Sequence, residues 1–167
     1  AVTLTLGGTG TLPAELAVPV TADVIDAGGG TAISGTDYTT IGTQTLTFVA
    51  GSTDSTVQNV VITPTNDRLV EGNETVNLTL QNVSSLDGQG SITAASNTTT
   101  IDDDDTASLA IVATDTATEE GGAQNTAVTL TLGGTGTGAA ELAVQLIADV
   151  VGAGGGSAVS GTDYTAI

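Results

Sequence analysis

One stretch of sequence, AVTLTLGGTGT, occupies residues 1–11 and recurs unchanged at residues 127–137. Val, Thr and Leu alternate within it over 2–6, so successive side chains would point to opposite faces of a strand. Such residues favour the pleated conformation, and the glycines that follow favour a turn. The stretch therefore predicts a β-strand followed by a turn at both places in the chain.

The duplication extends beyond these residues. Aligned without gaps at an offset of 126, residues 1–41 and 127–167 share 31 of 41 residues. The chain thus holds one period of 126 residues and the start of the next. The acidic run at 101–105 marks the boundary and gives two domains: 1–105 is the back portion of one repeat, and 106–167 is the front portion of the next. We interpret the chain as a window cut from a longer tandem array, or as a subunit whose ends are completed by neighbouring copies.

Strand-like segments recur through the period and are separated by turn signals such as the glycines at 28–30 and 51. Helical periodicity is nearly absent. About seven short strands in a period are typical of an antiparallel β-sandwich. The expected strands are 44–49, 56–63, 75–82, 97–101, 107–114, 127–132 and 141–150.

The composition excludes several classes of function. The 167 residues include 19 acidic side chains and one basic side chain, for a net charge of −18, and no His or Cys. Zinc sites built on imidazole or thiolate, and His or Cys catalysis, are therefore absent. One Arg cannot form a basic patch for nucleic acid, and no apolar run is long enough for membrane insertion. We therefore expect no enzymatic activity, no nucleic-acid partner and no insertion into a membrane.

Several motifs, taken in order from the boundary, make the chain similar to the Calx-beta repeat. They are Glu120-Gly121 after a first strand, SGTDY at 34–38, TLTFVAGS at 45–52, VVITPTNDRLVEGNET at 60–75 and TTTIDDDD at 98–105. The resemblance covers essentially the whole period. It implies an all-β, seven-stranded antiparallel Greek-key β-sandwich of immunoglobulin-like type that binds calcium. The chain departs from the family pattern at Asn66-Asp67, where the family has paired acids, and in its longer, Gly-rich period.

The resemblance also implies a set of ligands. Glu120 and Asp163 belong to the second repeat, whose site is incomplete within this chain. The residues implied as metal ligands are Asp37, Asp67, Glu71, Glu74, Asp102, Asp103, Asp104, Asp105, Glu120 and Asp163.

The residues themselves also indicate a metal. Residues 102–105 are four successive aspartates, and unit charges about 4 Å apart repel by roughly 1 kcal/mol in water and about 4 kcal/mol at an effective dielectric near 20. The single Arg cannot neutralise them. Ca²⁺, which accepts six to eight oxygen ligands in flexible geometry, suits this set better than Mg²⁺. An acidic run alone is more often a solvated linker, so the hypothesis depends on its combination with the D-x-x-x-E-x-x-E motif of Asp67, Glu71 and Glu74 and with the Asp37-Tyr38 pair.

Three functions compete. The first is a calcium-stabilised structural repeat module of an extracellular bacterial filament or adhesin stalk, at the cell surface or outside the cell, with neighbouring copies of the repeat as its partners. The second is a calcium-sensing regulatory module, which the near identity of the two copies disfavours. The third is a ligand-binding adhesin domain that uses rows of Thr such as Thr3 and Thr5.

Overall fold

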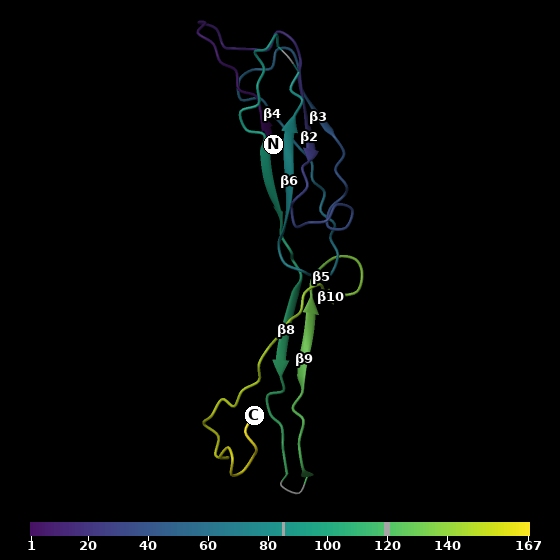
Figure 1. Ribbon diagram of the computed structural model, residues 1–167, viewed down its shortest axis with the longest axis vertical. Helices are drawn as coiled ribbons and strands as arrows, with labels where there is room; N and C mark the ends of the chain where they lie inside the picture. The colour runs from purple at the N-terminus through teal and green to yellow at the C-terminus, as the bar shows by residue number, and fades with distance from the viewer. Residues whose placement is uncertain (85, 119–120) are drawn as a thin grey trace.

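The computed structural model describes residues 1–84, 86–118 and 121–167. These residues form an elongated molecule of β-strands and loops (Figure 1). None of the described elements is an α-helix, so the prediction of an all-β fold is confirmed. Within those ranges the structure has no helix with the length and apolar character needed to cross a bilayer.

The largest sheet has four antiparallel strands in the order β3-β2-β6-β7. In β2 and β6 every second side chain is buried, as expected for strands that present one face to a core. Val24 of β2 lies opposite Gln44 of β3 on one side and Leu80 of β6 on the other. The strands are β2 (Val20–Asp26), β3 (Gln44–Phe48), β6 (Glu74–Gln81) and β7 (Ser96–Ile101).

The other described strands form pairs. β1 (Val2–Thr3) is antiparallel to β4 (Val57–Gln58), and β8 (Thr106–Ile111) is antiparallel to β9 (Val128–Gly133). The third pair is parallel and joins β5 (Leu69–Val70) to β10 (Glu141–Leu142). This parallel pair connects the C-terminal part of the chain to the part that contains the large sheet.

The core lies between the large sheet and the layer that contains β1. Val24, Leu46, Val76 and Leu78 of the sheet form one buried cluster with Tyr38. A second cluster contains Leu16, Val20 and Phe48, and the side chains of Val2, Leu4 and Leu6 pack against it. Two layers packed through alternating apolar side chains are consistent with the predicted β-sandwich.

Most of the expected strands are confirmed near their positions, and three are much shorter than expected. Segment 2–6 is a strand only at Val2–Thr3, segment 56–63 only at Val57–Gln58, and segment 141–150 only at Glu141–Leu142. The equivalent of 143–150 in the first copy is 17–24, which contains the first five residues of β2, and β2 lies between β3 and β6. The second copy has no such neighbours within the described part of the chain, and a strand without ladder partners is not stable.

Candidate metal centre

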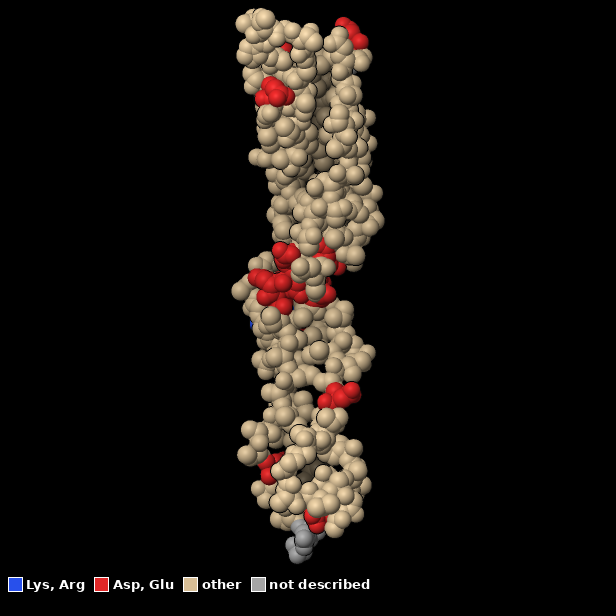
Figure 2. Space-filling view, turned by 90° about the vertical axis from the view of Figure 1, so that its left-hand side faces the viewer, with Lys and Arg blue, Asp and Glu red and all other residues tan. Residues whose placement is uncertain are grey.

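Carboxylates cluster about midway along the long axis of the molecule, between the large sheet and the β8–β9 hairpin (Figure 2). They surround a cavity of about 40 Å³. Because one water needs roughly 10–15 Å³ on this measure, the cavity has room for an ion together with some of its water. The lining residues are Asp37, Thr65, Asn66, Asp67, Leu69, Glu71, Gly72, Glu74, Ile101, Asp102, Asp103, Asp104 and Asp105.

Three of these side chains converge most closely. Asp37, Glu71 and Glu74 each place one carboxylate oxygen within 4.8 Å of the corresponding oxygens of the other two. Calcium–oxygen bonds are about 2.3–2.6 Å long, so two ligands of one ion lie at most about 5 Å apart. The three oxygens are therefore close enough to share one cation.

Asp37 is held by a turn before the core. Its backbone N–H donates to the carbonyl of Ile33 (2.9 Å), and the N–H of Ile33 donates to Asp37 Oδ2. Gly35 supplies the left-handed conformation of the turn with φ 86°. The next residue, Tyr38, is buried and donates its hydroxyl to Asp26, which raises the pKa of Tyr38 and lowers that of Asp26. The buried tyrosine thereby anchors the neighbouring carboxylate.

The two glutamates lie on either side of the turn between β5 and β6. Burial raises the pKa of Glu74 to about 7, assisted by a hydrogen bond to Asp37 and by the negative charges of Asp37 and Glu71. Burial, together with the surrounding aspartates, also raises the pKa of Glu71. Glu74 Oε2 is buried and accepts no hydrogen bond. These shifts come first from burial and then from neighbouring negative charges, so the protein leaves the charged forms of both glutamates poorly stabilised.

Asp103 has a different environment. Its Oδ2 accepts the backbone N–H groups of Glu71 (3.0 Å) and Gly72 (2.7 Å), and its Oδ1 accepts that of Asp105 (2.8 Å). Burial opposes ionisation of Asp103, but these three donors outweigh it and lower its pKa. Asp103 therefore remains a carboxylate and ties the turn before β6 to the aspartate run.

The remaining aspartates differ in how many hydrogen-bond donors their carboxylates have. Asp102 accepts the amide of Asn73 (2.8 Å), and Asp67 accepts the N–H of Leu69 (3.0 Å). Asp105 Oδ1 is buried and accepts no hydrogen bond. Burial and the neighbouring aspartates raise the pKa of Asp105, and Arg68 offsets this only in part. A second oxygen in the cluster is thus left without a donor.

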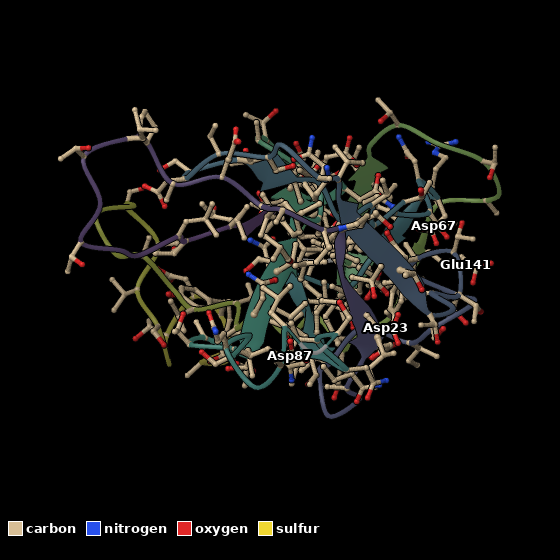
Figure 3. The ribbon with its side chains drawn as sticks, turned by 90° about the horizontal axis from the view of Figure 1, so that it is seen from above. Asp23, Asp67, Asp87 and Glu141 are labelled. Atoms are coloured by element: carbon tan, nitrogen blue, oxygen red, sulfur yellow. The ribbon has the colours of Figure 1, made fainter. Side chains whose placement is uncertain are left out.

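A loop from the second copy covers one side of the centre. Thr135 donates its hydroxyl to Asp104 Oδ2 (2.9 Å), and the N–H of Glu141 donates to the carbonyl of Arg68 (3.1 Å). In the view along the long axis, Asp67 and Glu141 lie on the same side of the molecule, away from Asp23 and Asp87 (Figure 3). The centre therefore includes the contact between the two parts of the chain.

Gly136 makes this contact possible, because a Cβ atom there would lie 2.0 Å from the carbonyl oxygen of Asp67 and its φ is 123°. We expect Gly136→Ala to open the contact and destabilise it by about 1–3 kcal/mol, the range for backbone strain. Small-angle X-ray scattering should show a shorter maximum dimension with a bent joint. Gly10→Ala is the matched control, since the sequence around it is the same and nothing lies within 4 Å of its Cβ position. Identical scattering curves for the two variants would contradict this expectation.

Eight of the ten residues predicted as ligands line the cavity: Asp37, Asp67, Glu71, Glu74, Asp102, Asp103, Asp104 and Asp105. Asp163 does not line it and accepts the N–H of Val159 (2.7 Å) in its own turn. Glu120 lies outside the described residues. The sequence did not predict that Asn73 and Thr135 contact the aspartates of the centre. Asn73 lies next to a turn and Thr135 lies within a glycine-rich loop, and these positions were the only available signals.

The donor set consists of oxygen atoms, most of them from carboxylates, which is suited to a hard cation such as Ca²⁺ or Mg²⁺. Comparisons with protein-family models, with curated proteins and with solved structures gave no significant match. The functional argument therefore depends on the geometry of this centre.

Proposed function

We propose that the acidic centre binds calcium and that the chain is a calcium-stabilised structural repeat module of an extracellular filament or adhesin stalk. One observation carries the proposal. Eight carboxylates line a single cavity at the joint of an elongated molecule, and two of their buried oxygens have no hydrogen-bond donor.

The charge balance of the centre supports a bound cation. Arg68 is the only basic side chain in the sequence, and its Nε is buried without an acceptor. The pKa values of Glu71, Glu74 and Asp105 are raised first by burial and then by neighbouring negative charges, and a divalent ion would stabilise the charged form of each carboxylate. Calcium is favoured over magnesium because it accepts many oxygen ligands in irregular geometry, whereas magnesium demands an octahedron and retains its waters.

The proposal also specifies how the strands of each repeat are connected and how the repeats follow one another. Each 126-residue period would form one seven-stranded Greek-key sandwich of the Calx-beta type, and successive periods would stack in tandem. The duplicated sequence and the antiparallel sheets support this arrangement. In it the acidic centre lies between one module and the next.

A mechanical role suits the contacts at this joint. The link from Ile101 to Thr106 consists of four aspartates and contains no Gly or Pro, so it offers no free hinge. An ion shared by these residues and Glu71 would fix the direction in which β8 leaves the large sheet. Extracellular calcium-binding modules typically have dissociation constants of about 10⁻⁴–10⁻³ M, which suits permanent occupancy outside the cell.

Calorimetric titration of the full chain with calcium tests the proposal. Glu71→Gln and Glu74→Gln each keep the side-chain shape and remove one charge, and we expect either to weaken binding at least about tenfold, or about 1.4 kcal/mol. Asp149→Asn is the control, because it removes the same charge from an exposed residue outside the cavity. Wild-type affinity and stoichiometry in both glutamine variants would refute the assignment.

A further inference from the structure

A neutral side chain beside the acidic centre holds two of its aspartates. Asn73 donates its amide Nδ2 to Asp102 Oδ1 at 2.8 Å, and its Oδ1 accepts the backbone N–H of Asp103 at 3.0 Å. The amide is therefore used on both sides, once as a donor and once as an acceptor. Asn73 does not line the cavity, so any effect of this residue on a bound ion would pass through the aspartates that it holds.

Asp103 makes the matching contacts from the opposite side. Its Oδ2 accepts the backbone N–H groups of Glu71 and Gly72. Its Oδ1 accepts the N–H of Asp105, two residues further along the aspartate run. A carboxylate has about four lone-pair sites, and backbone donors occupy three of them here. In this structure Asp103 chiefly holds backbone groups in place.

Four hydrogen bonds in total join residues 71–73 to residues 102–103, and we call these four bonds the latch. The joined residues lie 29–32 positions apart in the sequence. The first segment is the turn between β5 and β6, and the second begins the link from β7 to β8. Each bond joins two groups of the protein, so the formation of the latch does not require an ion.

The latch opposes the repulsion that would separate the carboxylates. In three of its bonds the acceptor is a carboxylate, and hydrogen bonds to charged acceptors are roughly twice as strong as those between neutral groups. The donors are backbone N–H groups and one side-chain amide, which carry no net positive charge. The latch therefore gathers acidic residues in a sequence that has a single Arg.

We propose that the latch assembles the acidic centre before an ion binds, and that Asn73 and Asp103 are its positioning residues. In the calcium-free protein the latch holds Glu71 beside the aspartate run, and Glu74 follows at the first position of β6. Calcium then meets carboxylates that are already gathered, so little ordering of the chain opposes its binding. The statement about calcium affinity rests on the proposed function, whereas the statement about assembly does not.

Amide hydrogen exchange, followed by NMR on the full chain with a chelator present, tests the assembly. The N–H of Asp103 donates to Asn73, so Asn73→Ala should make this amide exchange at least about tenfold faster. The amide of Val76, in the ladder between β6 and β7, should exchange as in the wild type and shows that the sheet is intact. Asn97→Ala is the matched control, because the Asn97 side chain accepts only the hydroxyl of Thr99 among the described residues.

Two substitutions of Asp103 separate its hydrogen bonds from its charge. Asp103→Asn and Asp103→Ala remove the same negative charge, but the asparagine keeps an oxygen that accepts the N–H groups of Glu71 and Gly72. We expect the Gly72 amide to exchange slowly in the wild type and in Asp103→Asn, and at least about tenfold faster in Asp103→Ala. A residue whose only role is to bind calcium would produce no such difference in the presence of a chelator.

Calorimetric titration with calcium measures the effect on affinity. Asn73→Ala changes no charge and no residue that lines the cavity. We expect it to weaken calcium binding about tenfold, the lower end of the range for groups that orient metal ligands, with unchanged stoichiometry. Asn97→Ala should bind calcium as the wild type does.

Rapid exchange of the Gly72 and Asp103 amides in the calcium-free wild type, with slow exchange only after calcium is added, overturns the proposal, because the ion would then assemble the centre. Equal exchange in Asp103→Asn and Asp103→Ala also overturns it. Wild-type calcium affinity in Asn73→Ala removes Asn73 as a positioning residue. If the wild type binds no calcium but the exchange results are as expected, the assembly is supported and the calcium assignment fails, so the two failures are distinguishable.

Discussion

Chelation is expected to lower the melting temperature of the protein by about 5–10 °C for each ion removed. A ligand that binds only the folded state adds about 2.7 kcal/mol at a hundredfold excess over its dissociation constant, and 1 kcal/mol corresponds to about 2–4 °C in a chain of this size. The reason lies in the carboxylates around Glu74, which repel one another without a counter-ion. Thermal denaturation followed by circular dichroism, with millimolar calcium or with a chelator, measures the shift.

Two controls make this result specific to the centre. Magnesium at the same concentration should restore much less stability, because it does not adapt to irregular oxygen ligands. Glu71→Gln, with binding weakened about tenfold, should show at most about half of the wild-type shift at the same calcium concentration, whereas Asp149→Asn should behave as the wild type does. A melting temperature that does not respond to chelation would reject the metal assignment.

The second large effect concerns how the stability of the folded protein depends on pH. This dependence should have opposite signs in the calcium-free and the calcium-bound protein. The folded-state pKa of Glu74 is raised from 4.5 to about 7 by burial, by its hydrogen bond to Asp37 and by the charges of Asp37 and Glu71. Its contribution to stability is therefore fully present below pH 4.5 and is lost as the pH rises through 7. Glu71 and Asp105 shift in the same direction. Without calcium, the stability of the protein should fall between pH 4.5 and 7.

With calcium the trend should be the opposite, because the ion binds the deprotonated carboxylates and displaces the proton of Glu74. Calcium affinity should rise over the same interval, with net proton release on binding near pH ~6. Urea denaturation at a series of pH values measures the first effect, and calorimetry in buffers of different ionisation enthalpy measures the second. Glu74→Gln should weaken both effects. Parallel pH profiles with and without calcium would contradict the linkage.

Strands β3, β6 and β7 of the large sheet could be predicted because their signal is local. In segment 75–82 Val76 and Leu78 alternate with polar residues, and these two side chains are the ones buried. The same holds for Leu46 and Phe48 in β3. Alternation with period two is enough to identify such strands and the face that they bury.

The convergence of Asp37, Glu71 and Glu74 could not be predicted from spacing alone, since Asp37 lies far along the chain from the glutamates. Family resemblance suggested the set, and the turn anchored by Tyr38 brings it together. The contacts of Thr135 and Gly136 with the centre were missed because GGTGT has the pattern of an ordinary turn at both places where it occurs. Only its second occurrence lies beside Asp67 and Asp104.

The prediction of a strand over 141–150 was wrong beyond Leu142 for a related reason. The local pattern is that of a strand, but a strand depends on partners that the pattern does not specify. The first copy has β3 and β6 beside the equivalent segment, and the second copy has neither within the described residues. Sequence identity therefore did not ensure identical structure.

A crystal structure of the protein grown with calcium is the most direct test of the central claim. We expect a peak of anomalous density within about 2.3–2.6 Å of carboxylate oxygens from Asp37, Glu71 and Glu74, the distance range of calcium–oxygen bonds. In crystals grown at a calcium concentration near the wild-type dissociation constant, the same peak should be weaker for Glu71→Gln than for the wild type. Ordered water in this cavity at saturating calcium, with no anomalous signal between the three carboxylates, would contradict the claim that the centre binds calcium.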